Sequence, residues 1–205
     1  VQIDGGTLQT NSGIDTKRYL VIGDAGATLD VDGAANTTTL SGLVEGTGTL
    51  VKEGDGTLKI NFNAANYQGK TVGSDGSVTL SSTYTSNKIA GLSVNSGILE
   101  IDNAVKDLGG VVPVNLAGGE LRINETSKLG LVTVSNIGGT IDTTGATITT
   151  DVISGSGSIR KQGSGTLVLT KDNLYTGDTT ISEGKVQINS TKGLGGSGQL
   201  ILDGG

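Results

Sequence analysis

Two stretches decide the fold: residues 46–60 read GTGTLVKEGDGTLKI, and residues 155–169 read GSGSIRKQGSGTLVL. In both, every second position holds glycine, lysine or an aliphatic residue, and most positions between them are polar. A period of two predicts extended chain with one side facing a core and the other facing water. Glycines on the inward side predict corners, where the backbone passes too close to its neighbour for a side chain.

Each stretch continues into a second half, so that the clearest repeat copies span residues 46–80 and 155–188, here called the first and the second copy. The second half contains a tyrosine followed two residues later by glycine, and it ends with a Gly-x-apolar-x-apolar segment. The shared positions, which we predict to be structural, are Gly46, Gly48, Leu50, Gly54, Gly56, Leu58, Tyr67 and Gly69 in the first copy and Gly155, Gly157, Ile159, Gly163, Gly165, Leu167, Tyr175 and Gly177 in the second.

The combined pattern, G-x-G-x-L-x-K-x-G-x-G-T-L-x-L followed by N-x-Y-x-G-x-T and G-x-L-x-I, resembles the autotransporter-associated β-strand repeat of bacterial surface proteins. The second copy follows it nearly throughout, with Leu174 inserted before Tyr175. The first copy departs where Val72-Gly73 replaces the usual Thr-apolar pair. The resemblance implies a right-handed parallel β-helix in the passenger of a secreted protein, held at the outer membrane by a domain outside this chain.

A looser rhythm of Gly-x-apolar-x-apolar segments runs through the rest of the chain. A unit of roughly 20 residues cannot bury its own apolar face, so successive units must stack. We therefore predict an all-β fold, a right-handed single-stranded parallel β-helix of about ten turns of roughly 20 residues. Residues 1–205 would form one β-helix segment of a longer passenger. The competitor is an antiparallel barrel, which would favour Asn-Gly hairpin turns that the chain lacks.

The composition limits the core and the chemistry. Hydrophobic residues make up 34% of the 205 residues but aromatic residues only 2%, which predicts a thin aliphatic core. Without histidine or cysteine there is no Ser-His or Cys-His nucleophile pair and no usual zinc site, so we predict no cofactor and no metal. A net charge of −6 and the lack of a long apolar run argue against nucleic acid and against membrane insertion of this segment.

Several motifs resemble ligand sites, but the sequence around them is more typical of corners between strands. Residues 193–198 satisfy G-x-G-x-x-G, but a strand-like segment follows where a dinucleotide site needs a helix. Lys52 and Lys161 lie on the inward phase and could bind an anionic partner. We expect instead that each lays its methylene groups over the core and carries its ammonium group out at the corner beside Gly54 or Gly163.

The sequence leaves two classes of function open. The first is a non-enzymatic structural or adhesive rod on a bacterial surface, which would meet host cells or sister molecules through its lateral face. We also expect the isolated chain to associate end to end through the strand edges of its terminal turns. The alternative is a carbohydrate-binding or carbohydrate-cleaving β-helix, for which Glu100 and Glu120 could lie one above the other on neighbouring turns.

Overall fold

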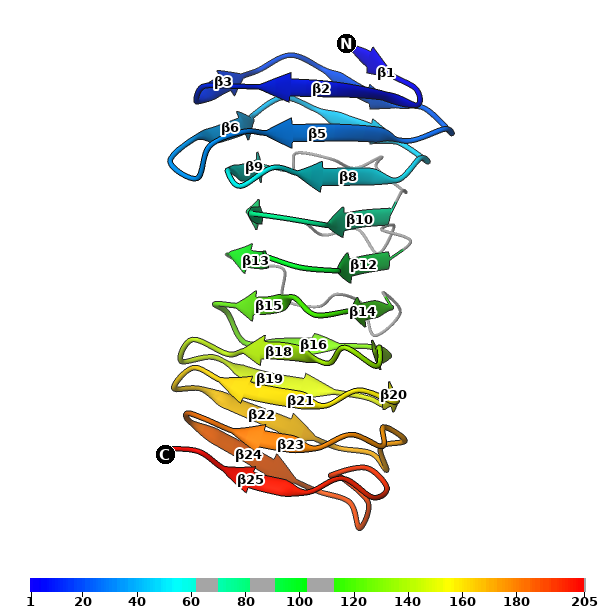
Figure 1. Cartoon of the computed structure of the whole chain (residues 1–205), viewed down its shortest axis with the longest axis vertical. Helices are drawn as coiled ribbons and strands as arrows, with labels where there is room; N and C mark the ends of the chain where they lie inside the picture. The colour runs from blue at the N-terminus through cyan, green and yellow to red at the C-terminus, as the bar shows by residue number, and fades with distance from the viewer. Residues whose placement is uncertain (62–69, 82–90, 103–112, 205) are drawn as a thin grey trace.

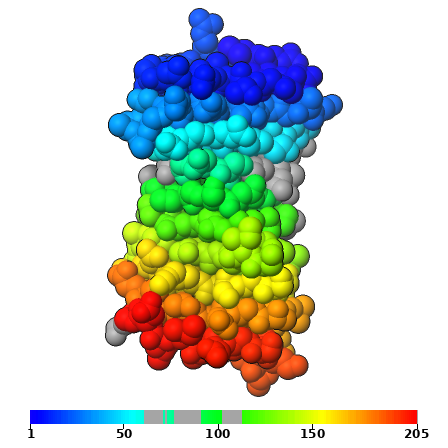
Figure 2. Space-filling model, in the orientation of Figure 1, coloured from blue at the N-terminus to red at the C-terminus, as the bar shows by residue number. Residues whose placement is uncertain are grey.

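The structure is a computed structural model that describes residues 1–61, 70–81, 91–102 and 113–204. Over these ranges the chain forms strands joined by corners, with no helix, and the turns stack along one axis from the N-terminus to the C-terminus (Figure 1). The space-filling view shows the same stack as successive colour bands along a rod (Figure 2). About eight turns follow one another at intervals of about 21 residues.

The described strands belong to four sheets. The three-stranded sheet contains β1 (Gln2–Ile3), β4 (Leu20–Ile22) and β7 (Val44–Gly46). The eight-stranded sheet contains β2 (Gly6–Thr10), β5 (Ala27–Val31), β8 (Leu50–Glu53), β10 (Lys70–Gly73), β12 (Gly91–Val94), β14 (Val114–Leu116), β17 (Val132–Val134) and β20 (Ile153–Gly155). The ten-stranded sheet contains β3 (Ile14–Thr16), β6 (Thr37–Leu40), β9 (Thr57–Asn61), β11 (Ser77–Ser81), β13 (Ile98–Asp102), β15 (Glu120–Ile123), β18 (Gly139–Asp142), β21 (Ile159–Gln162), β23 (Thr179–Ile181) and β25 (Leu200–Leu202). The four-stranded sheet contains β16 (Ser127–Leu129), β19 (Thr147–Thr150), β22 (Thr166–Leu169) and β24 (Lys185–Ile188).

The pairing confirms the parallel β-helix and excludes the antiparallel barrel. Each strand pairs in parallel with the strand one turn away, as in Leu99 with Leu121 and Leu121 with Ile141. The longest sheet has ten strands, because β23 and β25 extend it past β20, where the eight-stranded sheet ends.

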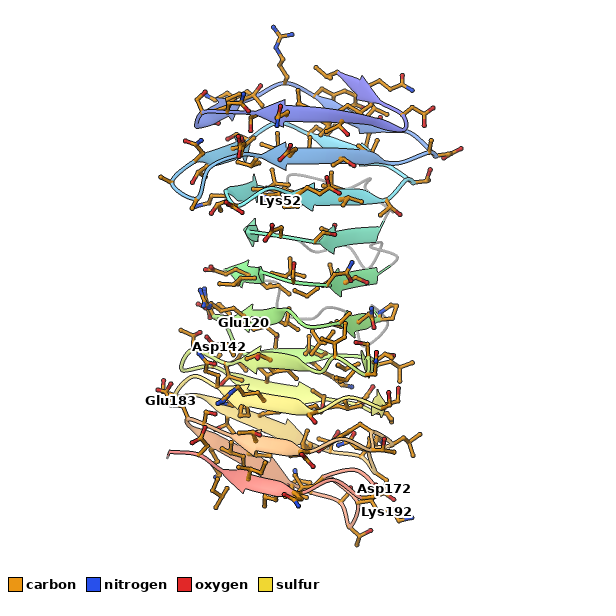
Figure 3. All side chains as sticks on the ribbon, viewed as in Figure 1. Lys52, Glu120, Asp142, Asp172, Glu183 and Lys192 are labelled. Carbon is orange, nitrogen blue, oxygen red and sulfur yellow. The ribbon has the colours of Figure 1, made fainter. Side chains whose placement is uncertain are left out.

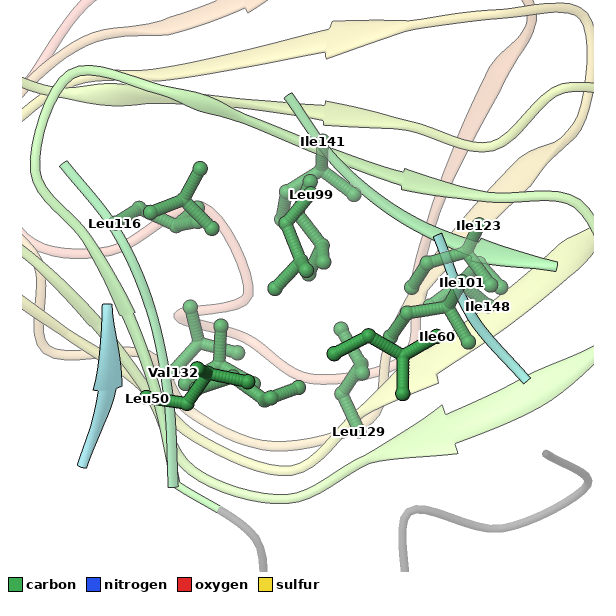
Figure 4. Close-up of a cluster of buried hydrophobic side chains, with 14 of the residues drawn as sticks. Leu50, Ile60, Leu99, Ile101, Leu116, Ile123, Leu129, Val132, Ile141 and Ile148 are labelled. Carbon is green, nitrogen blue, oxygen red and sulfur yellow. The ribbon is translucent and has the colours of Figure 1, made fainter. Parts of the chain in front are cut away.

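The core is a narrow aliphatic column inside the turns (Figure 4). Residues such as Leu50, Leu99, Ile141 and Ile148 are completely buried, and each lies against an aliphatic side chain of a neighbouring turn or a facing strand. Burying one such side chain contributes about 1.5–3 kcal/mol, so stacking supplies the stability that a single turn lacks. The thin aliphatic core expected from the composition is what the structure has, with Tyr175 as its one buried aromatic residue among those described.

Candidate functional site

The two copies of the repeat lie on different sides of the β-helix. In the first copy, Leu50 is in the eight-stranded sheet and Leu58 in the ten-stranded sheet. In the second copy, the equivalent Ile159 is in the ten-stranded sheet and Leu167 in the four-stranded sheet. The position of Leu50 in the eight-stranded sheet is taken by Ile153 five turns later. The motif therefore defines a corner between two strands and not a particular face.

Burial alternates along both copies with the period of two read from the sequence, except that Val168, on the outward phase of β22, is also buried. Leu50, Leu58, Ile159 and Leu167 are at most 2% exposed. Gly48, Gly56, Gly157, Gly163 and Gly165 are buried, and Gly46, Gly54, Gly155 and Gly177 are partly buried. Tyr67 and Gly69 lie outside the described residues.

The glycines of the corner meet two different demands. Gly54 and Gly163 have φ of +79° and +77°, a backbone conformation that other residues rarely adopt. Gly165 has ordinary φ, but a Cβ atom there would overlap the Ala146 carbonyl oxygen and lie 2.7 Å from that of Thr143. Gly56 is similar, since its Cβ would lie 2.8 Å from the Val31 carbonyl oxygen. Glycine is therefore required at Gly165 and Gly56 because the backbone of the preceding turn lies too close for a side chain.

The remaining glycines of the motif also lie against backbone. A Cβ atom at Gly46 or Gly155 would overlap the carbonyl oxygen of Ile22 or Val134. At Gly48 and Gly157 it would overlap the carbonyl oxygens of Gly23 and Ser135, and at Gly177 it would overlap the Gly157 backbone.

In both copies, the corner between the two strands encloses the ammonium group of a lysine. The Lys52 Nζ donates to the carbonyl oxygens of Glu53 at 2.7 Å, Gly54 at 2.7 Å and Asp75 at 3.4 Å. All three N–H bonds of the ammonium group are therefore used within the protein. Two of the acceptors belong to the corner of the lysine's own turn and the third belongs to the turn that follows. Figure 3 marks the turn that carries Lys52.

The second copy repeats this arrangement. The Lys161 Nζ donates to the carbonyl oxygens of Gln162 at 2.7 Å, Gly163 at 2.6 Å and Glu183 at 3.1 Å. Both lysine side chains are 0% exposed, so the expectation that the ammonium groups leave the core is wrong. Burial lowers the pKa of both lysines, and nearby carboxylates, Asp75 for Lys52 and Asp142 for Lys161, offset part of this effect. We call each lysine with its three carbonyl groups a lysine corner.

The second half of the repeat inserts two buried polar side chains. The Asn173 Oδ1 accepts the Ile153 N–H at 2.7 Å, and its Nδ2 donates to the Gly193 carbonyl oxygen at 2.5 Å, so one side chain joins three consecutive turns. The Tyr175 hydroxyl is 2.5 Å from the Thr179 hydroxyl, and burial raises the pKa of Tyr175. The role of Asn173 was not predicted from the sequence, although the asparagine of the N-x-Y pattern marks it.

Glu100 and Glu120 do not lie one above the other, because the register pairs Glu100 with Arg122 and Glu120 with Ile98. The Arg122 Nη2 donates to the Glu120 Oε1 at 2.6 Å, its Nε donates to the Asp142 Oδ2 at 3.3 Å, and its Nη1 lies 3.9 Å from the Glu100 Oε2. Arg122 thus lies among three carboxylates on the side of the ten-stranded sheet. The pair of free carboxylates that glycoside cleavage requires is replaced by an ion-pair network.

The pKa of Asp142 illustrates how this network acts. Burial alone would raise it, but hydrogen bonds from the Thr144 N–H and hydroxyl groups, together with the Arg122 guanidinium group, hold it below its usual value. The carboxylate therefore stays ionised and structural at neutral pH.

The described ranges contain neither a metal-binding group of His, Cys, Asp and Glu side chains nor a helix that could cross a membrane. The residues that the sequence singles out thus surround corners between stacked strands. A parallel β-helix is the architecture that the resemblance to passenger repeats implies.

Comparisons with known proteins agree with this class. Residues 159–188 match the family model of the passenger-associated-transport-repeat. The chain is 31% identical over 201 residues, 90% of its length, to the adhesin BmaC autotransporter of Brucella suis biovar 1 (strain 1330), and it spans 5% of that protein. No solved structure was found to match. Both comparisons confirm the resemblance to autotransporter passenger repeats.

Proposed function

We propose that the chain is a surface-exposed, non-enzymatic segment of an adhesin, acting as a rod that presents its lateral face. The observation that carries the proposal is the unbroken series of parallel pairs from β3 to β25 in the ten-stranded sheet, with buried Lys161 and Asn173 joining successive turns. Such a column extends a binding surface along the axis of the rod. The similarity to an autotransporter named as an adhesin supports exposure on the bacterial surface.

The lateral face of the second half offers apolar contacts. Leu131, Ile137 and Leu174 are 59%, 71% and 66% exposed on turns that have neighbours on both sides. Side chains of this size are usually buried, and those left on a surface are available to a partner. Host-cell surfaces and sister molecules are the partners proposed for this face. A carbohydrate-cleaving role finds no support in the Arg122 network described above.

Display of the passenger on a non-adherent bacterium tests the proposal. Substituting serine at Leu131, Ile137 and Leu174 together should reduce adherence to cultured epithelial cells and self-aggregation by more than half. A control with serine at Thr133, Thr140 and Thr176 should adhere normally. Equal adherence of both variants would exclude this lateral face, and adherence lost with Glu120→Gln alone would favour the carbohydrate alternative.

End-to-end association of the isolated chain remains part of the proposal. The terminal strand β25 leaves Leu200, Ile201 and Leu202 from 39% to 75% exposed. Sedimentation over a hundredfold range of concentration should show dimers or larger species, and a Leu200→Lys, Leu202→Lys variant should remain monomeric. A strictly monomeric parent chain would contradict it.

A further inference from the structure

The lysine corners pose a problem of buried charge. An ammonium group removed from water is costly unless it is paired and hydrogen-bonded. Among the ion pairs of the described residues none includes Lys52 or Lys161. The carboxylates that act on Lys52 from a distance are Asp75, Asp30, Asp55 and Glu53, and those that act on Lys161 are Asp142 and Glu183.

The shape of the corner explains why carbonyl oxygens take this place. The left-handed conformation of Gly163 reverses the chain so that the carbonyl groups of Gln162 and Gly163 converge on one point. Buried carbonyl groups without a partner would each destabilise the fold. The third carbonyl group, of Glu183, arrives only with the next turn. Its neighbour Gly184 lies so close that a Cβ atom there would overlap the Gly163 carbonyl oxygen.

We propose that each lysine corner is a cation site filled by the chain's own ammonium group, and that it locks the corner of one turn to the corner of the turn that follows. The site is directional, because the preceding turn contributes no carbonyl group to it. The lysine stem lies between inward side chains, with Lys161 paired to Ile141 before it and to Ile181 after it. The first copy has Leu29 and Gly73 at these positions.

Hydrogen exchange of the full chain tests the directional lock. Lys161→Met keeps an unbranched stem, one atom shorter than that of lysine, but removes the three donors. Ser182 and Lys185 donate backbone hydrogen bonds to the turn of Lys161, and their amides should lose protection at least about ten-fold. The amides of β18, in the preceding turn, should change less than about two-fold.

The matched control is Lys185→Met, at an exposed lysine of β24. It should leave exchange at the Ser182 amide unchanged. Unaltered protection of Ser182 in Lys161→Met, or an equal loss in β18, would overturn the proposal.

A chemical rescue tests the cation site independently. Lys161→Ala removes three methylene groups and the ammonium group, which n-propylammonium replaces. Its thermal midpoint should rise with n-propylammonium concentration, and above the dissociation constant the rise should follow the logarithm of that concentration, as binding to the folded state alone requires. Tetramethylammonium, which carries charge but no N–H donor, should produce no such rise, and neither should n-propanol. An equal response to both cations would overturn the proposal. If Lys161→Ala does not fold, the same titration of Lys52→Ala decides.

Discussion

The first and second copies share their corner geometry but not their surroundings. Lys52 and Lys161 have the same three kinds of acceptor, and Gly54 and Gly163 have the same backbone conformation. The corners nevertheless stand one sheet apart around the axis. The comparison teaches that the motif specifies a local reversal of the chain and its closure, while the number of residues in the intervening turns decides the face on which the reversal falls.

The largest expected difference lies between neighbouring positions of one corner. Gly165→Val should destabilise the chain by more than about 2 kcal/mol, because a side chain there would meet the backbone of Ala146 and Thr143. Thr166→Val, one residue further along and facing outward, should stay within about 0.5 kcal/mol. Chemical denaturation compares the two variants, read at several probes because stacked repeats need not unfold in one step. Equal effects would show that the assignment of inward and outward positions is wrong.

Asn173→Ala should be the next largest change. It leaves the Ile153 N–H and the Gly193 carbonyl group buried without their partner, at a cost of about 2 kcal/mol. Asn189→Ala, at an exposed position of the following turn, is the control and should leave the denaturation midpoint unchanged. A similar midpoint for both variants would show that Asn173 does not join the turns.

Tyr175→Phe should have a smaller effect, about 1 kcal/mol, by removing the hydroxyl that meets Thr179. It should also change the pH dependence. Because burial raises the pKa of Tyr175, the folded chain keeps its proton above pH 10 while the unfolded chain loses it. The parent chain should therefore lose stability as pH rises from 10 through the folded pKa, and Tyr175→Phe should lose less. Parallel pH profiles of the two proteins would contradict this.

Asp142→Asn should have the smallest effect on stability, and this effect should depend on pH. The pKa of Asp142 lies below its usual value of 3.8, so its contribution is present above pH 3.8 and is lost as pH falls through the folded pKa. Thermal midpoints of the variant should therefore be lower than those of the parent chain near pH 6 and should converge with them near pH 2. The matched change is Asp30→Asn. Asp30 pairs with the residue after Lys52, as Asp142 pairs with the residue after Lys161, and its carboxylate accepts a hydrogen bond from Gln9. A constant gap across this range for Asp142→Asn would exclude the ionised carboxylate as the cause.

Several features of the fold could be predicted because they are written in local periodicity. The alternation along residues 46–60 reports which side of a strand is buried, and the spacing of the segments predicts parallel stacking. The glycine positions predict corners because no other residue tolerates both the backbone conformation at Gly54 and the approach of Val31 to Gly56. Both copies could be recognised without knowing where they lie on the rod.

Other features depend on which residues of distant turns meet. Lysine at an inward position resembles a residue that reaches out of the core, and only the arrival of the Asp75 or Glu183 carbonyl group makes a buried ammonium group tolerable. Glu100 and Glu120 resemble a stacked pair until the register sets Arg122 opposite Glu100.

The sequence by itself therefore determined the strands, the corners and the parallel stacking, since each follows from the conformational limits and polarity of neighbouring residues. The tertiary structure decided the face of each copy, the three partners of each buried lysine and the neutralisation of the acidic pair. These features depend on register between turns about 21 residues apart, and a shift of two residues would change every partner while leaving the local pattern intact.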